Sequence, residues 1–203
     1  EYGNIFLENR YTDWGNYYPY RTLRNLWMLS RYVPAEKMQI EFLNKWRNAD
    51  KYGAADPFAP ARYNFDYLFA ITLAAQPLAW MEASNLPEEA YATASLLKKY
   101  QPLQLQFHQG VILPIGEEPS GRSWTGFQST VSDTQGYLVI YREDNEQSEG
   151  TMDTWLPVGE KVTFTPVMGN GKKFTVKVGA QGKVSFELKD KNSFALYQYE
   201  VKP

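Results

Sequence analysis

The chain has 203 residues, which is enough to bury a core as one large domain or as two small ones. Its net charge is -2, 22% of its residues are charged and it has one histidine, so it lacks the basic surface of a nucleic-acid-binding protein. It has no cysteine for disulfides or thiolate chemistry, and its longest apolar stretch, residues 68–75, is too short to cross a membrane. We therefore expect neither nucleic acid nor a membrane as a partner.

The first half of the chain alternates helical and extended patterns. Apolar residues spaced by three and four predict an amphipathic helix over 22–33, stopped by Pro34. Residues 38–43 alternate as a short strand does. The stretch 48–62 is polar and rich in Gly, Ala and Pro, which predicts a long loop.

A second alternation follows this loop. The apolar run 65–75 is either a buried strand or the start of a helix, and Pro77 is expected to interrupt it. Pro87, followed by two glutamates, is typical of a first helical turn. We predict a helix over 87–100, ended by Pro102.

The second half has a different texture. Short runs rich in Val, Phe, Tyr and Thr recur about every ten residues, separated by Gly and Asn, which is typical of an antiparallel sandwich. The predicted strands are 136–142, 161–165, 174–178, 184–188 and 194–199, with a tight turn at 169–171. The change of texture places a boundary within 106–114, so we predict two domains, 1–105 and 106–203.

Three segments of the first half carry a family resemblance. They are Arg10-Tyr-Thr-Asp13-Trp14 ahead of the first helix, the strand from Met38 to Asn44, and the segment from Leu73 to Leu86 with its Pro-Leu and Asn-Leu steps. Together they resemble the later barrel segments of the alpha-galactosidase (melibiase) clan, glycoside hydrolase families 27 and 36. The stretch 110–128 would then be the junction between barrel and sandwich.

The resemblance implies an α+β chain: the C-terminal portion of a (β/α)8 catalytic barrel, followed by an antiparallel β-sandwich. It implies a bacterial enzyme of the periplasm or the extracellular space that acts on α-linked sugars. The chain begins at Glu1 without methionine, so we expect that any targeting segment has been removed or was never part of this sequence. The strands that carry the catalytic nucleophile would lie upstream, so this chain is expected to be inactive alone.

Retaining glycosidases need two carboxyl groups, a nucleophile and an acid/base. In the clan that this chain resembles, the acid/base is an Asp just after a later barrel strand, which makes Asp13, beside Arg10 and Trp14, the candidate. The alternative for Asp13 is a turn residue before Gly15. Glu41 is the next choice, although its place in an alternating strand favours an outward-facing role.

Aromatic residues form 16% of the chain, and four of them gather at Trp14, Tyr17, Tyr18 and Tyr20. Flat aromatic faces pack well against sugar rings, so with Arg10 these positions are candidate substrate-binding residues. A hydrophobic plug beneath a long loop would have the same composition.

Two further substrate candidates are Trp46 and Arg47, because they directly follow the strand 38–43, where loops contribute to a barrel cleft. We expect no cofactor and no metal ion. His108 has no metal-binding partner of its own kind, and Glu117 and Glu118 are adjacent and expected to be solvated. The acidic turn 144–149 could bind calcium, but it is more typical of a solvated hairpin tip.

The alternative function is a non-catalytic carbohydrate-binding or structural module. In either case the expected partner is a carbohydrate. A partial barrel would also expose strand edges. Residues 1–105 are therefore expected to pair with the upstream barrel portion of the same polypeptide or with a second copy of the chain, to rearrange, or to be partly covered by their own loops.

Overall fold

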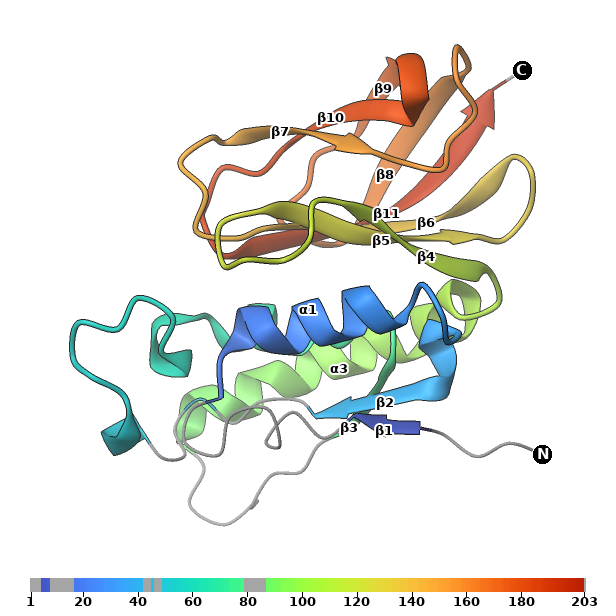
Figure 1. Ribbon diagram of the computed structural model, residues 1–203. Coiled ribbons are helices and arrows are strands. Elements are labelled where there is room, and N and C mark those ends of the chain that lie inside the picture. Colours follow the sequence, from blue (N-terminus) through green and yellow to red (C-terminus); the bar gives the residue numbers. More distant parts are fainter. Residues whose placement is uncertain (1–4, 8–16, 42–44, 46–48, 79–86, 203) are drawn as a thin grey trace.

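The computed structural model describes residues 5–7, 17–41, 45, 49–78 and 87–202. Figure 1 shows an antiparallel β-sandwich stacked on a layer of helices, with a small parallel sheet on the far side of the helices. The elements before the sandwich are β1 (Ile5–Leu7), α1 (Pro19–Leu29), β2 (Met38–Glu41), α2 (Phe65–Ala70), β3 (Gln76–Leu78) and α3 (Glu88–Phe107). Short 3-10 turns lie at Ala35–Lys37, Ala49–Lys51 and Pro60–Arg62.

The small sheet is parallel and has the order β1-β2-β3, so its strands are neighbours in chain order. Parallel strands need a crossover between them, and α1 and α2 lie in the connections from β1 to β2 and from β2 to β3. This is the β/α alternation expected of a barrel segment, present here as an open sheet of three described strands.

The helix α1 forms because its apolar residues recur on one face. Leu23, Leu26 and Trp27 are buried, as the spacing predicted. The helix runs from 19 to 29, earlier than the predicted 22–33, because Pro19 fits a first helical turn. Its regular hydrogen bonding stops at Ser30, so Pro34 is not the residue that ends it.

The sequence allows the run 65–75 to be either a strand or the start of a helix. In the structure it begins as the helix α2 and continues as turns. Pro77 does not interrupt structure as expected but lies inside β3. Among the described strands β3 pairs only with β2, so it is an edge, where a proline's missing N–H breaks no ladder bond.

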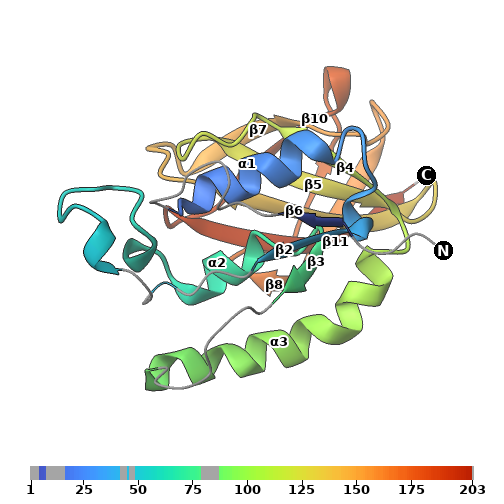
Figure 2. The same cartoon turned by 60° about the horizontal axis from the view of Figure 1, so that its bottom comes forward.

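The predicted end of α3 at Pro102 is also wrong, since the helix continues to Phe107 with Pro102 inside it. Tyr100 and Phe107 are buried on either side of this proline, and the Tyr100 hydroxyl donates to the Leu73 carbonyl oxygen at 2.5 Å. These tertiary contacts outweigh the local cost of a proline within a helix. Figure 2 shows α3 running along the outer side of the layer.

The sandwich has a six-stranded antiparallel sheet of order β4-β5-β6-β11-β8-β9, faced by the pair β10-β7. Its strands are β4 (Val111–Gly116), β5 (Trp124–Thr130), β6 (Gln135–Arg142), β7 (Glu149–Asp153), β8 (Lys161–Gly169), β9 (Phe174–Lys177), β10 (Lys183–Glu187) and β11 (Ser193–Lys202). All five predicted strands are confirmed, whereas β4, β5 and β7 were missed. The tight turn predicted at 169–171 is wrong, because Gly169 still belongs to β8 and the connection to β9 covers 170–173.

The six-stranded sheet is the middle layer of the molecule, because both of its faces are buried. Phe127, Val139 and Tyr141 pack with the helices, while Ile140 and Phe164 pack beneath β7 and β10. The α+β fold class is therefore confirmed, with the passage from helix to strand falling at 108–110. The division into domains 1–105 and 106–203 stays a prediction.

Within the described residues, no helix is both long enough and apolar enough to span a membrane.

Candidate functional site

The carboxyl ends of the parallel strands form one edge of the small sheet. β1 ends at Leu7, β2 at Glu41 and β3 at Leu78, and because the strands are parallel these three ends lie on the same side. Ligands of parallel α/β sheets bind at this side, where the loops that follow the strands converge. This edge is the candidate site.

Five of the predicted site residues belong to the segments that follow β1 and β2 but lie outside the described residues. They are Arg10, Asp13, Trp14, Trp46 and Arg47. Their roles stay predictions, and their positions in the sequence place them directly after two of the three strand ends.

Glu41 is the last residue of β2 and is half-buried. Met38 and Ile40 of the same strand are fully buried, so the alternation expected of an outward-facing Glu41 is present. Its backbone carbonyl accepts a hydrogen bond from the Tyr17 hydroxyl at 3.2 Å. This bond ties the segment ahead of α1 to the carboxyl end of the neighbouring strand.

Tyr17, Tyr18 and Tyr20, the described substrate candidates, belong to an aromatic cluster built from two segments, 17–20 and 52–58. The hydroxyl of Tyr52 accepts from the backbone N–H of Tyr17 and donates to its carbonyl oxygen, each at 2.8 Å. Burial raises the pKa of Tyr52. Its phenol therefore stays protonated and anchors the start of α1.

A carboxylate and a guanidinium bind the same cluster. Asp56 accepts from the Tyr18 hydroxyl at 2.8 Å and from the backbone N–H of Phe58 at 2.9 Å. Arg21 lies over the rings of Tyr18 and Tyr20, with its guanidinium carbon 5.0 and 5.7 Å from their centroids. The ring of Tyr20 is 5.0 Å from that of Phe58.

This arrangement combines half-exposed aromatic rings with the carboxylate of Asp56 and the guanidinium of Arg21. The rings can pack against a sugar ring, and the two charged groups can hydrogen-bond its hydroxyls. The rings also pack beneath the loop 49–62, as a hydrophobic plug would. The sequence predicted Tyr17, Tyr18 and Tyr20 but missed Tyr52, Asp56 and Phe58, because their loop has no periodicity that would indicate which residues turn inward.

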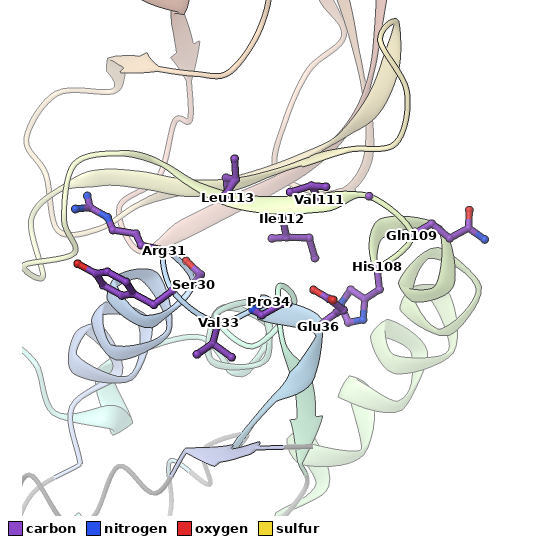
Figure 3. A pocket seen from close by; sticks show the side chains of 12 residues that line it. Ser30, Arg31, Val33, Pro34, Glu36, His108, Gln109, Val111, Ile112 and Leu113 are labelled. Atoms are coloured by element: carbon purple, nitrogen blue, oxygen red, sulfur yellow. The ribbon is translucent and has the colours of Figure 1, made fainter. Parts of the chain in front are cut away.

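A cavity of about 440 Å³ lies at the opposite edge of the sheet, lined by 30–34, Glu36 and 108–113. Figure 3 shows Glu36 and His108 close together at one end of it and Arg31 at the other. The His108 Nε2–H donates to the Leu73 carbonyl oxygen at 2.9 Å, and Nδ1 accepts from the Gln76 side chain at 3.2 Å. Both ring nitrogens are engaged, so this histidine has a structural role.

Burial lowers the pKa of His108, opposed by its bond to Leu73 and by the charge of Glu36. The imidazole is therefore neutral at pH 7. Among the described residues, no group of three or more His, Cys, Asp or Glu is placed to hold a metal ion. In the acidic turn, Asp144 and Glu146 instead form ion pairs with Lys191.

Glu143, just before that turn, is the carboxylate that sequence reasoning passed over. It is 1% exposed and accepts backbone N–H groups of the loop 118–123. The signal available was an acidic residue directly after the apolar run 136–141, where the chain has not yet left the core.

Comparison with known proteins gives structural matches alone. No family model matches the sequence, and no curated protein matches it. The galactosidase domain of the alpha-galactosidase-sucrose kinase AgaSK matches 91% of this chain with a TM-score of 0.62 and 9% identity. The GH36 alpha-galactosidase AgaA from Geobacillus stearothermophilus matches 83% with a TM-score of 0.51 and 8% identity.

This chain spans 25% of the length of the AgaSK structure and 22% of that of AgaA. Identities this low establish a shared fold and not shared residues. The chain therefore has the fold of a part of these alpha-galactosidases, and the resemblance found in its sequence is confirmed at the level of the fold.

Proposed function

We propose that this chain is the C-terminal portion of a glycoside hydrolase that acts on α-linked sugars, and that it is catalytically silent as a separate chain. The observation that carries the proposal is the run of parallel β/α units leading into a β-sandwich, in a chain of which 91% aligns with the galactosidase domain of AgaSK. AgaA, the second structural match, is likewise an alpha-galactosidase.

In this proposal Asp13 is the acid/base. It follows the last residue of β1 by six positions in the sequence, so we place it on the carboxyl-end side of that strand. Its carboxyl group would protonate the glycosidic oxygen as the bond to the sugar breaks, and then take a proton from the incoming water. The nucleophile that forms the covalent intermediate would come from a strand upstream of this chain.

The substrate would be held by residues from the same loops. Arg10 and Trp14 flank Asp13, and Tyr17 and Tyr18 continue into the aromatic cluster at the start of α1. Trp46 and Arg47 follow β2 in the same way. Aromatic faces would pack against the C–H face of the sugar while the charged groups bind its hydroxyls.

The test is turnover of p-nitrophenyl α-galactoside. We expect none above the buffer rate from the chain alone. In a polypeptide that supplies the upstream strands, Asp13→Asn should lower kcat by about 10²- to 10⁴-fold, because the general acid is lost. Asp66→Asn, an exposed position on α2, is the matched control and should keep full activity. If the chain alone turned over the substrate and Asp13→Asn abolished this turnover, the proposal that the separate chain is catalytically silent would be refuted.

A second candidate is a non-catalytic carbohydrate-binding module, and Trp155 favours it. This side chain is 61% exposed, yet its indole N–H donates to the Pro114 carbonyl oxygen at 3.1 Å. Its backbone N–H donates to the Gln128 side chain at 2.9 Å. A ring that is exposed and held in one orientation suits sugar packing. Binding of α-galactosides without turnover, lost in Trp155→Ala and kept in Tyr18→Ala, would support this function.

A further inference from the structure

The carboxyl group of Glu143 closes a loop of the sandwich. Its Oε2 accepts backbone N–H groups from Ser120 at 2.9 Å, Gly121 at 2.7 Å and Ser123 at 2.8 Å. Its Oε1 is buried and has no hydrogen-bond partner among the described residues. One oxygen therefore holds the loop, and the other faces the protein interior without a donor.

The loop that Glu143 holds lies against the helical layer. Gly121 has a φ of +88°, and a Cβ at this position would overlap the Phe58 ring. Glu118 of the same loop forms an ion pair with Arg24 of α1. The loop therefore contacts both Phe58 and α1, and a shift of the loop would change both contacts.

Phe58 connects this support to the candidate site. Its ring packs on Tyr20, and its backbone N–H is held by Asp56, which also holds the Tyr18 hydroxyl. A continuous set of contacts thus runs from Glu143 through Gly121 and Phe58 to Tyr18. The proposed function places Tyr18 in the sugar platform.

None of the ion pairs between described residues involves Glu143. Burial raises the pKa values of Tyr63 and Tyr67, and the nearby charge of Glu143 raises them further. The guanidinium of Arg142 donates instead to backbone carbonyl oxygens, including those of Asn145 and Leu188.

Two more charged groups lie beside the carboxylate in the chain. Asp144 is the next residue and pairs with Lys191. Arg122 lies in the loop itself and stays exposed. Burial raises the pKa of Glu143 to about 7, opposed by the bonds from the loop N–H groups. The carboxyl group therefore changes charge near neutral pH, and its bonds to the loop are stronger when it is ionised.

We infer that Glu143 is a positioning residue: its ionised carboxylate holds the loop 118–123 against Phe58 and so fixes the aromatic cluster of Tyr18 and Tyr20. That this cluster binds a sugar rests on the proposed function. The coupling between the loop and the aromatic cluster is independent of that function.

The test follows NMR signals of the chain from pH 5 to pH 9 without any sugar. We expect the amide protons of Ser120, Gly121 and Ser123 and the ring protons of Phe58 to shift together, with one midpoint near the Glu143 pKa of about 7. Glu143→Gln keeps the size of the side chain and should abolish all of these shifts. Glu117→Gln, an exposed control just before the loop, should leave them unchanged.

A second variant separates the contact between Glu143 and the loop from the contact between the loop and Phe58. Gly121→Ala places a methyl group against the Phe58 ring, so the shifts of Phe58 should be lost while the Ser123 amide still titrates. The inference is overturned if the loop amides do not titrate, or if they titrate without Phe58 in the unaltered chain. If the coupling is observed but no α-galactoside binds in any form of the protein, the proposed function fails and the inference stands.

Discussion

Glu143 is the residue at which burial and charge conflict most strongly. Burial raises its pKa from 4.5 to about 7, so the folded protein holds this proton more tightly than the unfolded chain does. Each unit of pKa corresponds to 1.36 kcal/mol, so the ionised group lowers the free energy of unfolding by about 3 kcal/mol. At neutral pH two effects therefore oppose each other: the ionised carboxylate forms the stronger hydrogen bonds to the loop, but its charge costs more free energy to bury than the protonated form.

The sign of this conflict gives a prediction. The stabilising contribution of the protonated group is fully present below pH 4.5 and is lost as the pH rises to about 7. The free energy of unfolding should therefore fall by about 3 kcal/mol between pH 4.5 and pH 8 beyond the trend of Glu143→Gln, as measured by urea unfolding. Glu117→Gln should follow the unaltered chain. Equal slopes for Glu143→Gln and the unaltered chain would contradict this assignment.

At the scale of the element, α3 shows a local rule overridden by packing. Pro102 has no N–H to donate to the Lys98 carbonyl, and its ring crowds that carbonyl. The helix nevertheless continues, because Tyr100 and Phe107 are buried beyond each side of the proline. The sequence rule that prolines end helices describes isolated segments and does not include this burial.

Restoring the missing donor should stabilise the helix. We expect Pro102→Ala to raise the free energy of unfolding by about 1–2 kcal/mol. Alanine has the higher helix propensity, but part of this gain is offset because the unfolded chain loses the restriction that proline imposes. Urea unfolding measures this change, with Gln101→Ala, an exposed neighbour, as the control expected to change stability by less than about 0.5 kcal/mol. A loss of stability in Pro102→Ala would show that Phe107 packs well only in a helix bent by the proline.

The strand β10, which was predicted, and the strand β5, which was missed, differ in burial. β10 alternates buried and exposed residues, so its period of two is visible in the sequence. β5 is buried on both faces over 124–129 and contains Thr, Gly, Gln and Ser, so it shows neither alternation nor an apolar run. Its polar side chains are buried because the sheet is the middle layer, as with Gln128, which binds the backbone of Trp155.

At the scale of the whole molecule, the open parallel sheet is the feature that needs a partner. β1 and β3 each pair only with β2 among the described strands, so each has a free edge. Unpaired edges recruit other strands. The predicted pairing, with the upstream barrel portion or with a second copy, would cover them.

For the separate chain this gives the prediction of a homodimer. Sedimentation velocity should show association that increases with concentration, and Ile5→Lys should weaken it, because Ile5 on the edge strand β1 is 48% exposed. Leu105→Lys, on α3 and 74% exposed, is the control for added surface charge and should leave association unchanged. A monomer at all concentrations would contradict the prediction.

Local patterns in the sequence were enough to predict β/α alternation in the first half, antiparallel strands beyond a boundary within 106–114, and a group of aromatic residues around the start of the first helix. Period and turn residues are local properties, so a single sequence shows them. Only the tertiary structure decided that Glu143 holds residues 120–123, that Gly121 meets Phe58 and that Tyr17 reaches Glu41. These contacts join residues 20 or more positions apart, and they depend on how the layers stack, which no local pattern encodes.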